Sequence, residues 1–156
     1  MSAQRRNSAR PEQNQPHNVV VLVEDEPGLR SAWIELLSEF GYQVHEAENG
    51  RSGLELVRDV HPDIVITDLV MPIEDGRTLA NAMRSDRQLR AIPIIAATGD
   101  ATQPADGELF DVVLRKPFHS TALLRALTEL LVPLSGSWLP LRNRDSSMGP
   151  LRALRN

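Results

Sequence analysis

The stretch IVITDLVMP (64–72) is an apolar run, dense in β-branched residues, that is interrupted by a carboxylate. Such residues favour a strand, and an unbroken apolar run of this kind is typical of a strand covered on both faces, as in a parallel sheet. The acid that ends the strand, Asp68, lies four positions before Pro72. An acid at the end of a buried strand needs a chemical reason, and the surrounding elements indicate one.

The segments on either side alternate between strand and helix patterns. Short apolar runs predict strands, and apolar residues at helical spacing predict helices. The expected strands cover residues 18–24, 42–47, 63–68, 92–98 and 111–117. The expected helices cover residues 27–40, 51–60, 76–85 and 120–131, with Trp33 and Phe40 on the core face of the first. This alternation predicts an α/β fold with right-handed crossovers and a doubly wound, five-stranded parallel sheet.

Length and composition are those of an ordinary globular protein. The 156 residues suit one domain with tails, and 41% of them are hydrophobic and 24% charged. The chain has no cysteine, which excludes disulfides and thiolate metal sites. No apolar run reaches the length of a membrane span, and residues 1–17 lack the apolar centre of a secretory signal. We therefore expect a cytoplasmic protein without membrane insertion.

The charge is unevenly distributed along the chain. Residues 1–17 carry a net charge of +2 and residues 133–156 a net charge of +3, so the −4 of the whole chain leaves −9 for residues 18–132. An acidic middle argues against direct binding of nucleic acid phosphates. The composition predicts a flexible N-terminal tail and a basic C-terminal tail that is either disordered or docks on a partner through residues such as Trp138.

Polar residues stand at the carboxyl ends of the expected strands, where ligands collect in doubly wound sheets. Four separate segments bring them to this edge: Glu24, Asp25, Asp68, Thr98 and Lys116. Three converging carboxylates repel one another unless a cation lies among them. Because no histidine or cysteine accompanies them, these hard oxygen ligands indicate Mg²⁺.

A phosphoryl group would complete the coordination of such a Mg²⁺. Lys116 would supply a positive charge opposite the metal, Thr98 a hydroxyl donor, and Gly99 an exposed backbone N–H. Asp68 is the natural nucleophile, since a carboxylate can form an aspartyl-phosphate. Lys116 is also the only lysine among 17 basic residues, which suggests a position that requires a compact ammonium rather than a guanidinium.

Four motifs, VEDE (23–26), TDLVMPIEDG (67–76), AATG (96–99) and RKPF (115–118), occur in this order. Together they resemble the receiver domain of bacterial two-component response regulators. The resemblance covers residues 18–132, which we expect to be the receiver domain between the two tails. It implies a flavodoxin-like receiver fold with strand order 2-1-3-4-5, and it implies that Asp68 is the phosphoacceptor.

The same resemblance implies a role for each residue of the site. Asp25 and Asp68 would bind Mg²⁺ directly, Glu24 would bind it through water, and the Val70 carbonyl would be a further ligand. The phosphoryl oxygens would be held by Thr98 and Lys116, with Val70 and Gly99 beside them. The Lys116–Pro117 peptide bond is expected to be cis, and Pro72 and Gly76 match the turn that follows the acceptor in the family.

In function, the resemblance implies a stand-alone receiver of the chemotaxis-regulator type. It would accept phosphate from a sensor histidine kinase or a histidine phosphotransfer protein and signal by changing the protein that it binds. The downstream partner is unknown, and a homodimer is left open. Such a domain is not an enzyme with an external substrate, because it catalyses only its own phosphoryl transfer and dephosphorylation.

Two features depart from the family pattern. The position of the aromatic switch residue, three before the lysine, is occupied by Val113. The segment from Thr98 to Lys116 is about one helical turn shorter than usual, and it contains GDATQPADGELF (99–110), a poor helix sequence. We therefore expect a shortened fourth helix and a switch in which Thr98 moves without an aromatic rotation.

Three alternative functions compete with this interpretation. A Mg²⁺-dependent phosphatase with an aspartate nucleophile needs a second aspartate two positions later, where this chain has Val70. A nucleotide-binding module would carry a glycine-rich loop after the first strand, where this chain has EDEPG (24–28). A receiver-like adaptor that is never phosphorylated remains an alternative, and the complete set of site residues disfavours it.

Overall fold

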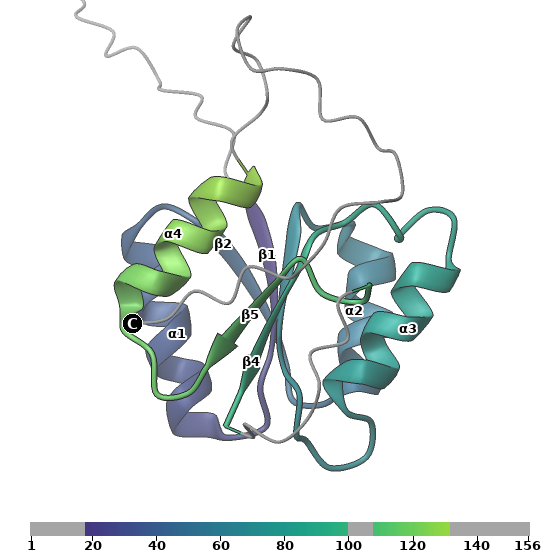
Figure 1. The fold of residues 1–156 in the computed structure, drawn as a ribbon, viewed down its shortest axis with the longest axis horizontal. Coiled ribbons are helices and arrows are strands. Elements are labelled where there is room, and N and C mark those ends of the chain that lie inside the picture. The colour runs from purple at the N-terminus through teal and green to yellow at the C-terminus, as the bar shows by residue number, and fades with distance from the viewer. Residues whose placement is uncertain (1–17, 100–107, 132–156) are drawn as a thin grey trace, which may run out of the picture.

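The computed structural model describes residues 18–99 and 108–131, which form an alternating series of strands and helices (Figure 1). The strands are β1 (Val19–Val23), β2 (Gln43–Ala47), β3 (Ile64–Asp68), β4 (Ile94–Thr98) and β5 (Val112–Arg115). The helices are α1 (Pro27–Glu39), α2 (Gly50–Val60), α3 (Gly76–Ser85) and α4 (Ser120–Leu131). The predictions for the two tails and for a shortened helix after β4 fall on residues outside the described ranges.

The five strands form one parallel sheet in the order β2-β1-β3-β4-β5, which confirms the predicted fold class. The central strand β3 pairs on one side with β1 and on the other with β4, where Asp68 is opposite Ala97. On the outer side of β4, Thr98 is opposite Arg115 of β5. This register brings the ends of β3, β4 and β5 to the same edge of the sheet.

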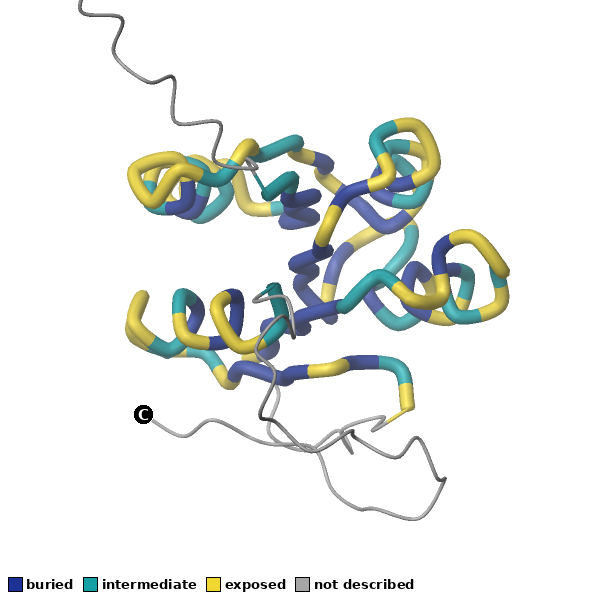
Figure 2. The backbone as a smooth tube through the Cα atoms, turned by 90° about the horizontal axis from the view of Figure 1, so that it is seen from above, coloured by how far each residue is buried: buried dark blue, intermediate teal, exposed yellow. Residues whose placement is uncertain are grey.

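Two helical layers cover the sheet, with α1 and α4 on one face and α2 and α3 on the other (Figures 1 and 2). Side chains along β3 alternate between these layers: Ile64 and Ile66 pack on the α1/α4 side, and Val65 packs on the α2/α3 side. Both faces of β3 are therefore buried under helices, which explains why its sequence is continuously apolar and does not alternate between apolar and polar residues. Within the described residues, no helix is long and apolar enough to span a membrane.

The ends of α1 follow from its flanking residues. Pro27 opens the helix, and the carboxylate of Glu26 caps it by accepting hydrogen bonds from the Leu29 and Gly28 N–H groups. These hydrogen bonds lower the pKa of Glu26. The predicted core position of Trp33 is confirmed, but that of Phe40 is wrong, because the Phe40 side chain is 59% exposed. Phe40 is the C-cap residue, where the chain leaves the helical path.

Arg84, near the end of α3, connects three segments at the edge of the α2/α3 layer. Its guanidinium donates to the Asp111 carboxylate at 2.9 Å and to three backbone carbonyls: Leu109 at 3.1 Å, Arg90 at 2.9 Å and Ile92 at 2.9 Å. The Asp111 carboxylate in turn accepts the backbone N–H of Ile94 at 2.8 Å. One side chain thus fixes α3 to the segments that lead into β4 and β5.

We expect Arg84→Leu to lower the free energy of unfolding by about 2 kcal/mol, because it removes several charge-assisted hydrogen bonds and the cation that pairs with Asp111. Urea unfolding monitored by circular dichroism measures the effect. Arg125→Leu is a matched control, since the Arg125–Glu129 ion pair is solvent-exposed and should change stability by about 0.5 kcal/mol or less. Equal losses of unfolding free energy in the two variants would contradict the role of Arg84 in fixing α3 to the neighbouring segments.

Candidate functional site

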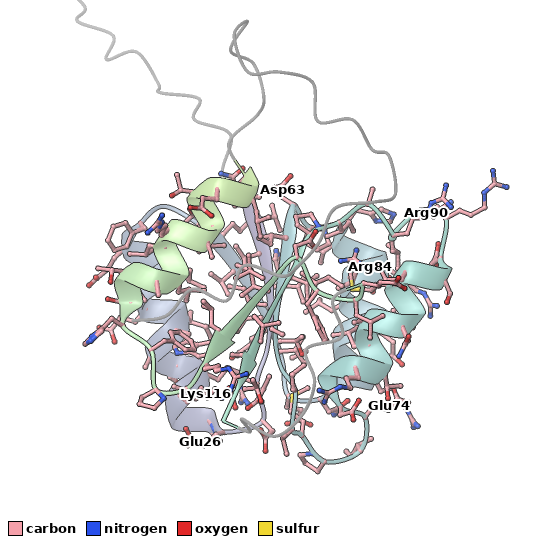
Figure 3. All side chains as sticks on the ribbon, in the orientation of Figure 1. Glu26, Asp63, Glu74, Arg84, Arg90 and Lys116 are labelled. Atoms are coloured by element: carbon pink, nitrogen blue, oxygen red, sulfur yellow. The ribbon has the colours of Figure 1, made fainter. Side chains whose placement is uncertain are left out.

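The predicted site residues lie at one end of the sheet. In Figure 3 the labelled Glu26, Lys116 and Glu74 are at the lower end of the molecule, while Asp63 and Arg90 are at the upper end. The lower end is where the strands finish, as expected for a ligand site in a doubly wound sheet. Three of the predicted residues are buried there: Glu24, Asp68 and Thr98.

Lys116 lies between two of the predicted carboxylates. Its Nζ atom is 2.7 Å from Asp68 Oδ2 and 3.1 Å from Glu24 Oε2. The lysine follows directly after β5, and its backbone N–H donates to the Thr98 carbonyl at 2.7 Å, which holds it against the end of β4. The structure therefore brings together side chains that are 48 and 92 residues apart in the chain.

Glu24, Asp25 and Asp68 form a candidate cation site. Each offers one carboxylate oxygen, and the three oxygens lie within 4.8 Å of one another. All three donors are hard oxygen ligands, and in the cluster they are joined by no histidine or cysteine, which suits Mg²⁺. The donor set of this structure is therefore consistent with the predicted metal, and two of its three carboxylates contact Lys116.

Burial and charge act in opposite directions on the ionisable groups. Burial raises the pKa of Glu24, although the Glu26 N–H and Lys116 partly oppose this by favouring the carboxylate. For Lys116, burial acts to lower the pKa, but the hydrogen bonds and charges of Asp68 and Glu24 outweigh it, so the pKa is raised. Lys116 is consequently a firmly protonated ammonium at neutral pH, as a counter-charge for phosphoryl oxygens must be.

The loop after β3 orients the carboxylate of Asp68. The Val70 N–H donates to Asp68 Oδ1 at 3.0 Å, and the Thr67 hydroxyl donates to the Asp68 carbonyl at 2.8 Å. A tight turn follows, in which the Glu74 N–H donates to the Pro72 carbonyl at 3.0 Å. One Asp68 oxygen thus contacts the backbone and the other contacts Lys116. The predicted role of the Val70 carbonyl as a metal ligand stays a prediction.

Thr98 ends β4, and Gly99 follows it at the same edge of the sheet. A Cβ atom placed on Gly99 would have no neighbour within 4 Å among the residues that the structure describes. The predicted cis bond between Lys116 and Pro117 is present. Val113, at the position of the family's aromatic switch, is buried in the core on the α2/α3 side, so an aliphatic side chain fills that place.

Two further residues, which no sequence motif marked as part of the site, contact it. The Arg30 guanidinium donates to the Glu24 carbonyl at 2.8 Å and pairs with Glu46 at 3.0 Å. The ring of Trp33 lies beneath Lys116, with Nζ 5.4 Å from the ring centroid. The helical period predicted that Trp33 is buried, but it carried no signal that the ring meets the lysine, because that contact depends on how α1 packs against the loop after β5.

A buried aspartate at the carboxyl edge of a doubly wound sheet, joined by a carboxylate cluster and a lysine, defines a class of protein, the aspartate phosphoacceptors. Within that class the family is also clear. The model of the response regulator receiver domain matches residues 20–128, and the chain belongs to this family. It is therefore a phosphoacceptor signalling domain of the kind used in two-component systems.

Individual relatives agree with this assignment. Protein PilH of Pseudomonas aeruginosa is 35% identical over 72% of this chain and 96% of its own length. Hybrid signal transduction histidine kinase D of Dictyostelium discoideum is 34% identical over 74% of this chain, which corresponds to only 8% of that kinase. Among solved structures, the response regulator TrrA of Thermotoga maritima, in complex with Mg²⁺–BeF, has a TM-score of 0.67 and 29% identity over 73% of this chain and 99% of its own.

Proposed function

We propose that the chain is phosphorylated on Asp68 in a Mg²⁺-dependent reaction, with a sensor histidine kinase or a histidine phosphotransfer protein as donor. The observation that carries the proposal is the contact of 2.7 Å between Lys116 Nζ and Asp68 Oδ2 at a cluster of three carboxylates. This arrangement combines a carboxylate nucleophile with fixed charges of both signs, which phosphoryl transfer requires. The Mg²⁺ complex of TrrA supports the same metal here.

In the proposed reaction, an Asp68 oxygen forms a bond to phosphorus while the bond from phosphorus to the donor nitrogen breaks. The Mg²⁺ would be held by Glu24, Asp25 and Asp68, with the Val70 carbonyl, and would neutralise charge on the transferred group. The lysine ammonium and the Thr98 hydroxyl then donate to phosphoryl oxygens, and the backbone N–H groups of Val70 and Gly99 are available for the same purpose.

The output that we propose is a change in protein binding. The phosphoryl group on Asp68 shifts the conformational population of the domain toward the conformer in which that group makes more favourable contacts. The partner protein recognises this conformer. Catalysis is limited to the chain's own phosphoryl transfer and dephosphorylation. A phosphatase with an aspartate nucleophile needs a second aspartate two positions later, and this chain has Val70 there. The proposed organisation is a receiver domain over residues 18–132 that acts in the cytoplasm, between an N-terminal tail over residues 1–17 and a basic C-terminal tail over residues 133–156.

The test of this function is phosphorylation by a small donor. The protein is incubated with acetyl phosphate, with Mg²⁺ or with EDTA, and its intact mass is measured. We expect the mass to rise by one phosphoryl group only when Mg²⁺ is present. Reduction of the acyl phosphate with borohydride, followed by peptide mapping, should identify Asp68. No labelling with Mg²⁺ would instead favour an adaptor that functions without phosphate.

We expect Lys116→Arg to slow phosphorylation by about 100-fold while the protein stays folded. The ammonium is surrounded by Asp68 and Glu24 at hydrogen-bonding distance, and a planar guanidinium cannot occupy the same point. Time courses of labelling by acetyl phosphate give the rate. Arg115→Lys is the matched control, because it makes the reverse exchange at the neighbouring exposed position. A normal rate in Lys116→Arg would mean that positive charge alone is sufficient.

A further inference from the structure

Lys116 makes two kinds of contact. The carboxylates of Asp68 and Glu24 lie 2.7 Å and 3.1 Å from Nζ. The same nitrogen lies over the ring of Trp33, whose centroid is 5.4 Å away. That distance is within the range in which the negative face of an indole attracts an ammonium, and tryptophan is the strongest of the aromatic residues in this interaction.

Trp33 also contacts the chain beyond the lysine. Its ring and that of Phe118 have centroids 5.6 Å apart and are inclined by 45°. Phe118 follows the Lys116–Pro117 bond by one residue, so a single side chain of α1 touches the lysine and the loop that carries it. Trp33 is itself fixed, because only 8% of it is exposed and it belongs to the core that α1 and α4 share.

We propose that Trp33 is a positioning residue for Lys116, whose ring holds the ammonium at the acceptor when the carboxylates are engaged by a cation. This inference rests on the function proposed for Asp68. A divalent cation among Glu24, Asp25 and Asp68 would compete for the oxygens that Lys116 contacts in this structure. The attraction of the ring does not depend on those oxygens, so it persists when they turn toward the cation.

The simpler explanation is that Trp33 only fills the core. Both explanations predict some loss of stability when the ring is removed, so stability does not distinguish them. They differ in the environment of the Lys116 side chain once a cation engages the carboxylates, because only a positioning ring must still lie over the ammonium in that state. They also differ in the phosphorylation rate of variants with equal stability.

The first experiment uses the single lysine of the chain. Protein labelled with ¹³C at the lysine ε carbon gives one Hε–Cε signal from this chain, recorded without phosphodonor, first without metal and then with saturating Mg²⁺. In the wild type we expect the Hε protons upfield of those of free lysine in both spectra, because the ammonium stays over the Trp33 ring. In Trp33→Leu the signal should return to the free-lysine position, and Trp33→Phe should retain part of the shift. A wild-type signal at the free-lysine position, or one that moves there when Mg²⁺ is added, would overturn the proposal.

The second experiment compares rates of labelling by acetyl phosphate with saturating Mg²⁺. We expect Trp33→Leu to be about tenfold slower and Trp33→Phe to be intermediate. Leu37→Val is the matched control, since Leu37 is buried in the same helix and core and should leave both the rate and the lysine signal unchanged. Equal rates in Trp33→Leu and Leu37→Val would overturn the proposal. If the wild type takes no phosphate, the function proposed for Asp68 fails, and the lysine signal then decides the role of Trp33.

Discussion

Asp68→Asn should abolish phosphorylation by acetyl phosphate and leave the protein folded. A carboxamide oxygen is a poor nucleophile and provides no anionic ligand for Mg²⁺, so we expect the labelling rate to fall by about a thousandfold or more. The roles of nucleophile and metal ligand fall to the same side chain. One Asp68 oxygen contacts Lys116, and Asp68 is also a member of the carboxylate cluster. Intact-mass spectrometry after incubation with donor and Mg²⁺ measures the loss.

The same variant should keep its stability within about 1 kcal/mol. Asparagine can still accept the Val70 N–H through its carbonyl oxygen, and Lys116 retains its contact with Glu24 at 3.1 Å. The variant also removes one of three mutually repelling carboxylates, which offsets part of the lost ion pair. Loss of labelling can therefore be separated from loss of folding.

Asp75→Asn is the matched control for this substitution. Asp75 is the N-cap of α3, where its Oδ1 accepts the Thr78 N–H at 2.8 Å, and asparagine caps helices as well as aspartate does. We expect this variant to be labelled at the normal rate. Labelling that persists in Asp68→Asn would move the acceptor to another residue.

The sequence predicted the sheet and most of its helices because both depend on short-range patterns. The bounds of α3 and α4 were predicted at the residues where the structure has them, and β3 differs from its predicted span by one residue. The buried β3 needs apolar side chains on both faces, and such a run is visible without a partner. The convergence of Asp68 and Lys116 followed from topology, since the carboxyl ends of parallel strands share one edge.

Contacts between side chains and distant loops could not be predicted in the same way. The helical period predicted that Trp33 and Phe40 are both buried in the core. In the structure Trp33 is buried and its ring contacts Lys116, whereas Phe40 is exposed at the end of the helix. The hydrogen bonds of Arg84 go largely to backbone carbonyls. Every residue carries a carbonyl, so no sequence motif predicts these contacts. Ile73 adopts a positive φ of 72°, which its side chain disfavours and which the turn after the acceptor imposes.

Gly76→Ala should be the most destabilising of the small substitutions near the site. A Cβ atom at this position would be 2.2 Å from the Asp68 carbonyl oxygen and 2.9 Å from the Thr67 hydroxyl oxygen. The nearest of these is backbone of the acceptor strand, which cannot move without displacing Asp68 itself. We expect the free energy of unfolding to fall by about 3 kcal/mol and phosphorylation to slow as well, because the acceptor shifts relative to Lys116.

The reason for glycine at this position is space and not backbone conformation. Among the described glycines only Gly41 has a positive φ, so an alanine at position 76 would meet no unfavourable φ. Gly99→Ala is the matched control, because a Cβ there has no neighbour within 4 Å in the described part of the chain and should change the free energy of unfolding by about 0.5 kcal/mol or less. Denaturant unfolding of both variants decides the question. Equal losses of unfolding free energy in the two variants would mean that the close approach of α3 to the acceptor strand does not require glycine. A loss confined to Gly76→Ala would mean that the first residue of α3 fixes the backbone next to Asp68.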